Sequence, residues 1–385
     1  MEKDIYERLF EHYNNTPWTR AGCTEEIMEI YRLTFTLEEA ELALHLEFPE
    51  ELGGKGRFKT AADIAQEMGK DEREVARMLD NMVVRCCVVK LEMEGKAFYA
   101  TMGFSVMCDA YQGVDASKVP GGSIDKAQKL GALWTKYFGL GPDDVPEASH
   151  LKEFASDYPI QRVLSVEDAL DPEAEVLPFE RVSQILDNAK VISVIQSPCR
   201  KRHARFTGCE KPIEVTVVLD LLANAYITSY RTRVITKEEA LELLKLGHDH
   251  GLVTLTLNTQ SGPGQVMNLC QCCNDCCNFL APYVRTADPR SIAKSNYLPR
   301  IDAGKCNFCK RCVEVCPVRA MFYHAPYKLD RSDETIHVVE ERCIGCGLCA
   351  HNCPEGAIKL VKARDVVPVE TLKEMILKYN EGRIF

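Results

Sequence analysis

The spacing of apolar residues predicts helices over the first part of the chain. Apolar positions recur at helical intervals within residues 24–46, 60–69 and 71–85, and polar or glycine-rich stretches separate these segments. Asp71 occupies the position of a helix cap in front of the third segment. One face of that third helix is expected to be buried, and its apolar residues are Val75, Met78, Leu79 and Met82. The N-terminal region is therefore predicted to be mainly helical.

Two strands are predicted after the third helix, at residues 83–90 and 97–102, with a turn at Glu94-Gly95. Three helices followed by a β-hairpin resemble a winged helix-turn-helix domain. We assign residues 1–108 to a domain of this type.

A winged helix often binds DNA through a helix that faces the phosphates, and such a helix should be clearly basic. Residues 71–85 instead carry acidic residues (Asp71, Glu72, Glu74 and Asp80) against basic ones (Arg73, Arg77 and Arg85). This charge argues against nucleic acid and favours a docking or dimerisation module, with a second copy of the chain as one candidate partner. Cys86 and Cys87 fall within the first predicted strand and are interpreted as small buried hydrophobic residues.

Helical and strand-like segments alternate in the middle of the chain. Residues 109–170 are interpreted as a connector, and residues 171–295 as a small α/β cysteine-rich domain with its chemistry at the strand ends. The segments that carry this prediction are helices at 179–189 and 236–250 and strands at 191–195 and 252–257. Neither GxGxxG nor a P-loop is present, so no nucleotide site of these types is expected.

Composition limits the class of protein. The chain has 385 residues and a formal net charge of −10, which allows several domains and argues against general affinity for nucleic acid or anionic membranes. It contains no run of eighteen apolar residues, and its first ten residues lack the apolar core of a signal peptide, so a cytoplasmic protein is expected. Nineteen cysteines in a reducing compartment indicate metal or redox chemistry.

Eight of these cysteines form two copies of one motif, Cys-x2-Cys-x2-Cys-x3-Cys-Pro. The motif makes residues 296–362 similar to bacterial two-cluster ferredoxins, and residues 363–385 are expected to form a C-terminal helix. The resemblance implies two 4Fe–4S clusters, in which the fourth cysteine of each copy ligates the other cluster. One cluster would be bound by Cys306, Cys309, Cys312 and Cys353, and the other by Cys343, Cys346, Cys349 and Cys316.

This spacing has a physical basis. Three thiolates, each separated from the next by two intervening residues, can wrap one loop around three corners of a cube. The fourth ligand must come from elsewhere. Gly345 and Gly347 allow close approach of the backbone, so that amide N–H groups can point at sulfur. Structural zinc would need four thiolates in two pairs and is therefore not favoured. A long hairpin at residues 321–339 is a candidate partner contact.

A second concentration of cysteines lies earlier in the chain. Five cysteines fall within residues 270–277, and the pair Cys199 and Cys209 is predicted to lie in a loop after a strand. We predict that these segments converge on a third metal site, bound by Cys199 and Cys209 with two of Cys272, Cys273 and Cys276. The basic residues at 200–205 would offset the negative charge of bound thiolates.

Several hypotheses compete for this third site. An additional iron–sulfur cluster is the first, and a structural zinc ion or a thiol–disulfide pair at Cys273 and Cys276 are the alternatives. The paired cysteines resemble those of the cysteine-rich domains of heterodisulfide reductases, although the long-range spacing differs. The order of strand, cysteine pair and Cys-x3-Cys resembles thioredoxin-like ferredoxins, but 62 residues between Cys209 and Cys272 depart from that pattern.

These features predict a multidomain α+β protein that transfers electrons through iron–sulfur clusters. It resembles the ferredoxin-like subunits of larger oxidoreductase complexes, so protein redox partners are expected. One alternative is a redox-sensing winged-helix transcriptional regulator. Another is a reductase with a catalytic cluster at the cysteine-rich loop.

Overall fold

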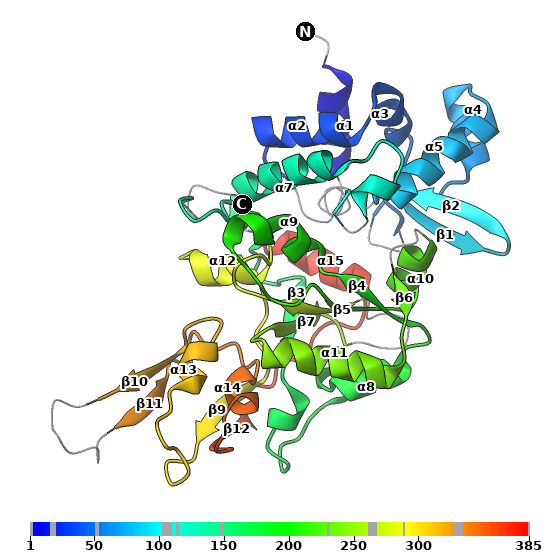
Figure 1. Ribbon diagram of the computed structural model, residues 1–385. Helices are drawn as coiled ribbons and strands as arrows, with labels where there is room; N and C mark the ends of the chain where they lie inside the picture. Colours follow the sequence, from blue (N-terminus) through cyan, green and yellow to red (C-terminus); the bar gives the residue numbers. More distant parts are fainter. Residues whose placement is uncertain are drawn as a thin grey trace.

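The computed structural model describes residues 3–15, 21–50, 54–101, 110–112, 115–145, 150–228, 232–260, 268–287, 289–325 and 334–383. A mainly helical N-terminal region lies at one end, a six-stranded sheet occupies the middle, and the eight-cysteine region lies at the other end (Figure 1). Within these described ranges, every helix is too short or too polar to cross a membrane.

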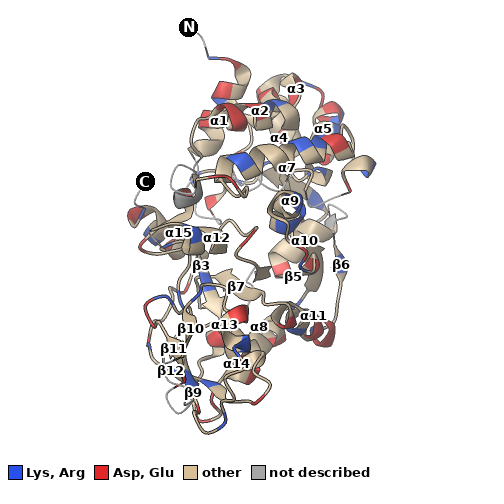
Figure 2. Ribbon diagram, turned by 60° about the vertical axis from the view of Figure 1, so that its left-hand side comes forward, with Lys and Arg blue, Asp and Glu red and all other residues tan. Residues whose placement is uncertain are grey.

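The N-terminal region consists of helices and one β-hairpin, and both acidic and basic residues occur along its helices (Figure 2). The helix predicted at residues 24–46 is in fact two helices, because Thr36 caps the second one in a capping box with Glu39. The elements are α1 (Ile5–Asn14), α2 (Glu25–Thr34), α3 (Leu37–Ala43), α4 (Ala61–Met68), α5 (Glu72–Val84), β1 (Val89–Met93), β2 (Lys96–Ala100) and α7 (Ile124–Phe138).

The predicted β-hairpin is present, but its first strand begins later than expected. The helical pattern of α5 continues to Val84, so the start of the strand predicted at 83–90 was wrong. Cys86 and Cys87 are buried, as expected, but they lie in the turn between α5 and β1 rather than in a strand. Met102, the last residue of the second predicted strand, lies outside the described residues, as does Cys108.

The central sheet has the strand order β3-β7-β8-β5-β4-β6, and every neighbouring pair is antiparallel. The predicted strands at 191–195 and 252–257 correspond to β4 and β7, whereas β5 and β8 were not predicted. The strands are β3 (Gln161–Leu164), β4 (Ile192–Gln196), β5 (Glu214–Leu219), β6 (Arg233–Val234), β7 (Val253–Leu257) and β8 (Asn268–Cys272).

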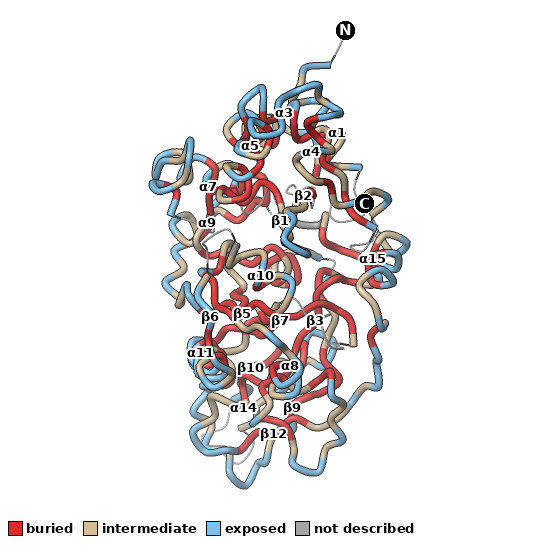
Figure 3. Tube along the Cα trace, turned by 90° about the vertical axis from the view of Figure 1, so that its right-hand side faces the viewer, coloured by how far each residue is buried: buried red, intermediate tan, exposed pale blue. Residues whose placement is uncertain are grey.

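Different parts of the chain pack against the two faces of this sheet. α8 (Val182–Asn188) and α11 (Lys237–Asp249) pack on the face that carries Leu164 and Leu269. The opposite face, which carries Val163, joins the core of the eight-cysteine region. The remaining central helices are α9 (Pro198–Thr207), α10 (Asp220–Thr228) and α12 (Leu280–Arg285). Buried segments follow the strands through the middle of the molecule (Figure 3).

The C-terminal region contains short elements that carry the cysteine loops. They are β9 (Tyr297–Ile301), α13 (Arg311–Val315), β10 (Met321–His324), β11 (Thr335–Val338), α14 (Leu348–His351), β12 (Ile358–Lys362) and α15 (Leu372–Glu381). The predicted hairpin is formed by β10 and β11, with residues 326–333 outside the described part. α15 returns to the middle of the molecule, where Met375 and Tyr379 pack in a core with Leu257.

Helix α7 fixes the N-terminal region against α9 of the central region. Gly131 of α7 faces the backbone of α9, and a Cβ atom at this position would lie 2.9 Å from the carbonyl oxygen of Arg202. One turn later, Thr135 shares a hydrogen bond of 2.8 Å with the buried His203 of α9. The close approach of these two helices therefore depends on the missing side chain at Gly131.

Replacing Gly131 by valine should force α7 away from α9 and lower the free energy of unfolding by about 1–3 kcal/mol, the usual cost of overpacking. Thermal or urea unfolding followed by circular dichroism measures this loss. Ala132 is exposed on the same helix, so Ala132→Val provides a matched control. Equal destabilisation by the two substitutions would contradict this account of the contact.

Candidate metal centres

The eight C-terminal cysteines surround two separate cavities. The first cavity is lined by Cys306, Cys309, Cys312 and Cys353, and the second by Cys316, Cys343, Cys346 and Cys349. Each set combines three cysteines of one sequence motif with the fourth cysteine of the other, which is the crosswise arrangement that the ferredoxin resemblance implies. We call them the outer set and the inner set.

Backbone geometry lets these loops close around the cavities. Gly345 and Gly347 have φ values of +72° and +83°, and a Cβ atom on Gly345 would lie only 2.4 Å from the carbonyl oxygen of Tyr297. Amide N–H groups also point at sulfur, because Ala320 donates to Cys316 Sγ (3.2 Å) and Ala357 donates to Cys353 Sγ (3.4 Å). Such hydrogen bonds stabilise the negative charge of a thiolate bound to metal.

The two sets differ in exposure. In the outer set Cys309 is exposed, whereas no member of the inner set is exposed, and Cys343 and Cys349 are buried. Burial raises the pKa of Cys312 to about 11 and also raises the pKa of Cys346. These thiols would therefore be protonated at neutral pH without a metal, and metal binding would release their protons.

The inner set is attached to the central region by hydrogen bonds. The amide of Val166 donates to the carbonyl oxygen of Cys346 (2.9 Å), and the Ser165 hydroxyl donates to that of Gly345 (2.7 Å). From the five-cysteine segment, Asn274 Nδ2 donates to the carbonyl oxygen of Pro317 (3.0 Å), directly after Cys316. The inner set therefore lies at the junction of the C-terminal and central regions.

Comparison with known protein families matches residues 305–357 to the 4Fe-4S dicluster domain. A protein of Sinorhizobium fredii named as a ferredoxin is 36% identical over 91 residues, which make up 18% of this chain and 84% of that protein. Through this domain the chain belongs to the 4Fe-4S dicluster ferredoxins. All eight cysteines of the outer and inner sets lie within the matched residues.

Two relatives in Escherichia coli also match part of the chain. Electron transport protein HydN of Escherichia coli is 31% identical over 103 residues, covering 24% of this chain and 53% of that protein. Hydrogenase-4 component A of Escherichia coli is 40% identical over 63 residues, covering 16% of this chain and 27% of that protein. The chain thus spans about half the length of HydN and about a quarter of the length of hydrogenase-4 component A. Comparison with solved structures finds no match.

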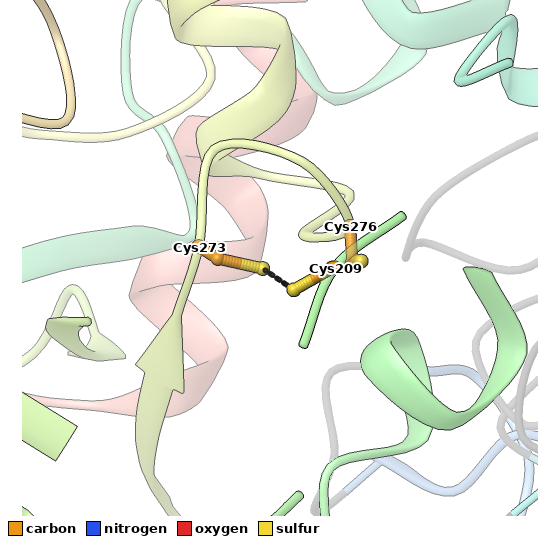
Figure 4. Close-up of side chains that lie close together, drawn as sticks. All are labelled: Cys209, Cys273 and Cys276. Atoms are coloured by element: carbon orange, nitrogen blue, oxygen red, sulfur yellow. Dashed lines mark hydrogen bonds between the residues drawn. The ribbon is translucent and has the colours of Figure 1, made fainter. Parts of the chain in front are cut away.

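A third group of thiols lies in the central region. Cys209, Cys273 and Cys276 have sulfur atoms within 4.8 Å of one another, and no other group of three or more His, Cys, Asp or Glu ligand atoms is as compact in the described part of the chain (Figure 4). The sulfurs of Cys209 and Cys273 are 3.8 Å apart. A tetrahedral ion with metal–sulfur bonds of about 2.3 Å has sulfur–sulfur edges of about 3.8 Å, so this spacing suits a single thiolate-bound metal.

The surroundings of this Cys209 group favour thiolate at Cys273, whereas the hydrogen bonds among the three thiols raise the pKa of Cys209 and Cys276. Hydrogen bonds from Cys209 and Cys276, with the nearby Arg200 guanidinium, lower the pKa of Cys273. Arg200 is buried and its Nη1 lies 4.0 Å from Cys273 Sγ, while the Thr207 hydroxyl lies 3.2 Å from Cys276 Sγ. Part of the predicted basic stretch therefore does lie beside the thiols.

The structure brings together only some of the residues predicted for the third site. Cys199 does not lie in a loop, because Ser197 caps α9 and places Cys199 in its first turn. There Cys199 Sγ accepts a hydrogen bond from Arg202 Nη2 (3.5 Å), outside the Cys209 group. Cys272, the last residue of β8, is also outside that group. The missed strand β8 explains this separation, since strand residues alternate between faces.

The crosswise sets predict an unusual pattern of cysteine substitutions. Anaerobically purified protein should contain about eight irons from this domain, and Cys353→Ser should remove the same cluster signal as Cys306→Ser, although Cys353 follows the second motif. Iron analysis and low-temperature EPR of the reduced protein measure this. Cys86→Ser serves as a control, because Cys86 is buried far along the chain from either motif. The assignment would be contradicted if Cys353→Ser removed the EPR signal that Cys343→Ser removes, because Cys343 belongs to the inner set.

Proposed function

We propose that the chain passes electrons through two 4Fe–4S clusters, bound by the outer and inner sets, to or from a partner oxidoreductase. The observation that carries this proposal is that two crosswise cysteine sets each surround a cavity within the dicluster domain. When bound, clusters of this type supply one-electron transfer. The protein holds them with cysteine thiolates, donates N–H groups to their ligand sulfurs and shields the inner set from water.

The outer set is the proposed side for the partner. The β10–β11 hairpin lies beside it, since Ile336 of β11 lines the outer cavity and Lys310 Nζ lies 4.0 Å from the ring centroid of Tyr323 in β10. Phe322 on this hairpin is 47% exposed and stacks on His337. Two relatives, one named as a hydrogenase component and one from Salmonella typhimurium named as part of a tetrathionate reductase, support an oxidoreductase complex as the partner.

Replacing Phe322 by alanine should slow electron exchange with the protein that copurifies under anaerobic conditions by about tenfold, equivalent to ~1.4 kcal/mol of lost contact. Stopped-flow absorbance of the clusters measures the rate, and reduction by dithionite should be unchanged because it needs no docking. Leu377→Ala is the matched control, since Leu377 is 53% exposed on α15. Equal slowing by both substitutions would remove the hairpin from the proposed interface.

We place an additional centre at Cys209, Cys273 and Cys276. Asn274, between two of these cysteines, contacts the backbone next to Cys316 and thus links this group to the inner set. An iron–sulfur centre there would extend the electron path, and zinc is the structural alternative. Three thiols leave a fourth metal position for another ligand, the pattern of catalytic rather than closed structural sites, which supports a reductase as the second candidate function.

This placement distinguishes Cys209 from Cys199, which were both predicted from the sequence as ligands of the third site. Cys209→Ser should remove the metal of the central centre and leave the EPR signals of the dicluster domain intact. Cys199→Ser should leave both unchanged, because Cys199 lies outside the compact group. Metal analysis with EPR distinguishes the two variants. Equal metal loss from both would restore Cys199 as a ligand.

We infer that the N-terminal region is a winged-helix-like docking or dimerisation module rather than a DNA-binding domain. Among the basic residues near the end of α5, Arg85 is buried in an ion pair with Glu39 and is withdrawn from any phosphate contact. The exposed side of α5 keeps its acidic residues, including Glu72 and Glu74. Sequence-selective DNA binding that disappears on cluster oxidation would overturn this inference in favour of a redox-sensing regulator.

A further inference from the structure

The cysteines that the Cys209 group leaves out form a second group in the same segment. They are Cys270, Cys272 and Cys277. All three side chains belong to one buried core, with Cys272 and Cys277 buried and Cys270 half-buried. We call them the Cys272 group.

Strand geometry explains why the two groups are separate. Cys270 and Cys272 are two residues apart in β8, opposite Leu255 and Val253 of β7, so they share one face of the sheet. The chain then turns through residues 273–276 and returns at Cys277. Cys273 and Cys276 belong to a different core, which they share with Val215 and Leu252.

Hydrogen-bond donors are directed at the sulfurs of the Cys272 group. The amides of Phe279 and Leu280 both lie 3.4 Å from Cys277 Sγ, and Asn268 Nδ2 lies 2.8 Å from Cys270 Sγ. The amides directed at Cys316 and Cys353 of the dicluster domain form the same kind of contact. Amide donors of this kind stabilise the negative charge of a cysteine that is held as a thiolate.

The Cys272 group is placed toward the inner set. Its core also contains Cys343, with Cys316 and Cys346 packed against it. The Cys209 group lies in the other core, so residues 270–277 place one set of thiols in the core of the inner set and another set in a separate core.

We propose that Cys270, Cys272 and Cys277 bind an iron–sulfur centre of their own, separate from the centre at Cys209, Cys273 and Cys276. Soft thiolate ligands select iron–sulfur clusters, and the three thiols share one core. The chain then holds four centres, two in the dicluster domain and two on opposite sides of one cysteine segment. The proposal does not rest on the electron-transfer function, because metal content is measured without any partner.

Adjacent cysteines provide the test. In anaerobically purified full-length protein, Cys272→Ser and Cys277→Ser should lose the same metal component, whereas Cys273→Ser and Cys276→Ser should lose a different one. Iron and zinc are measured by elemental analysis and the iron component by Mössbauer spectroscopy, so either metal is identified. Loss of one common component in all four variants indicates a single shared centre and overturns the proposal, as does unchanged metal in both Cys272→Ser and Cys277→Ser.

A measurement on the unmodified chain covers the case in which a variant fails to fold. Cys270 is half-buried, so a small alkylating reagent should reach it once its metal is removed by a chelator. Peptide mass spectrometry should show Cys270 protected before chelation and labelled after it, with dicluster absorbance retained at mild chelator concentrations. Equal labelling of Cys270 before and after chelation overturns the proposal.

Discussion

The position of β8 between β7 and β5 is the constraint on which the central chemistry depends. Backbone hydrogen bonds on both sides hold this strand, so the register Val253↔Cys272 fixes where each following cysteine can point. A shift of one residue would exchange the faces and break both thiol groups. The sheet therefore acts as the rigid support of a segment that would otherwise be a flexible cysteine-rich loop.

The dicluster domain connects to this support from one side. Hydrogen bonds from Ser165, Val166 and Asn274 reach the loops of the inner set, whereas the outer set faces away, next to the β10–β11 hairpin. One end of the domain is thus built into the protein and the other is available to a partner. This polarity distinguishes the chain from a free-standing ferredoxin, in which no larger central region covers one cluster.

The sequence predicted the dicluster domain well because its ligands are set by local spacing, three thiolates on one loop and a fourth from the other. Helices with strong caps, such as those opened by Asp71 and Thr236, were also found in place. The pairing of strands that lie far apart in the sequence could not be predicted in this way. β8 holds two cysteines and no β-branched residue, so its strand propensity is weak and only pairing with β7 and β5 makes it a strand.

The same limit explains why the structure groups the central cysteines differently from the predicted third site. Cys199 follows a strand, which suggested a loop, but Ser197 and Pro198 start a helix immediately. Five cysteines in eight residues indicated metal binding without showing that they divide between two cores. That division follows from the alternation of side chains between the two faces of β8, which could not be predicted while β8 itself was not recognised as a strand.

The difference in exposure between the outer and inner sets has a further consequence for damage. Oxygen and peroxide arrive from solvent, and Cys309 is the one dicluster cysteine that is open to it among the described residues. Oxidative loss of iron should therefore proceed in order, starting at the outer set, while the inner set persists under its cover. If the outer set holds the cluster that exchanges electrons with a partner, as proposed, brief exposure to air would stop that exchange while the inner set still held its metal.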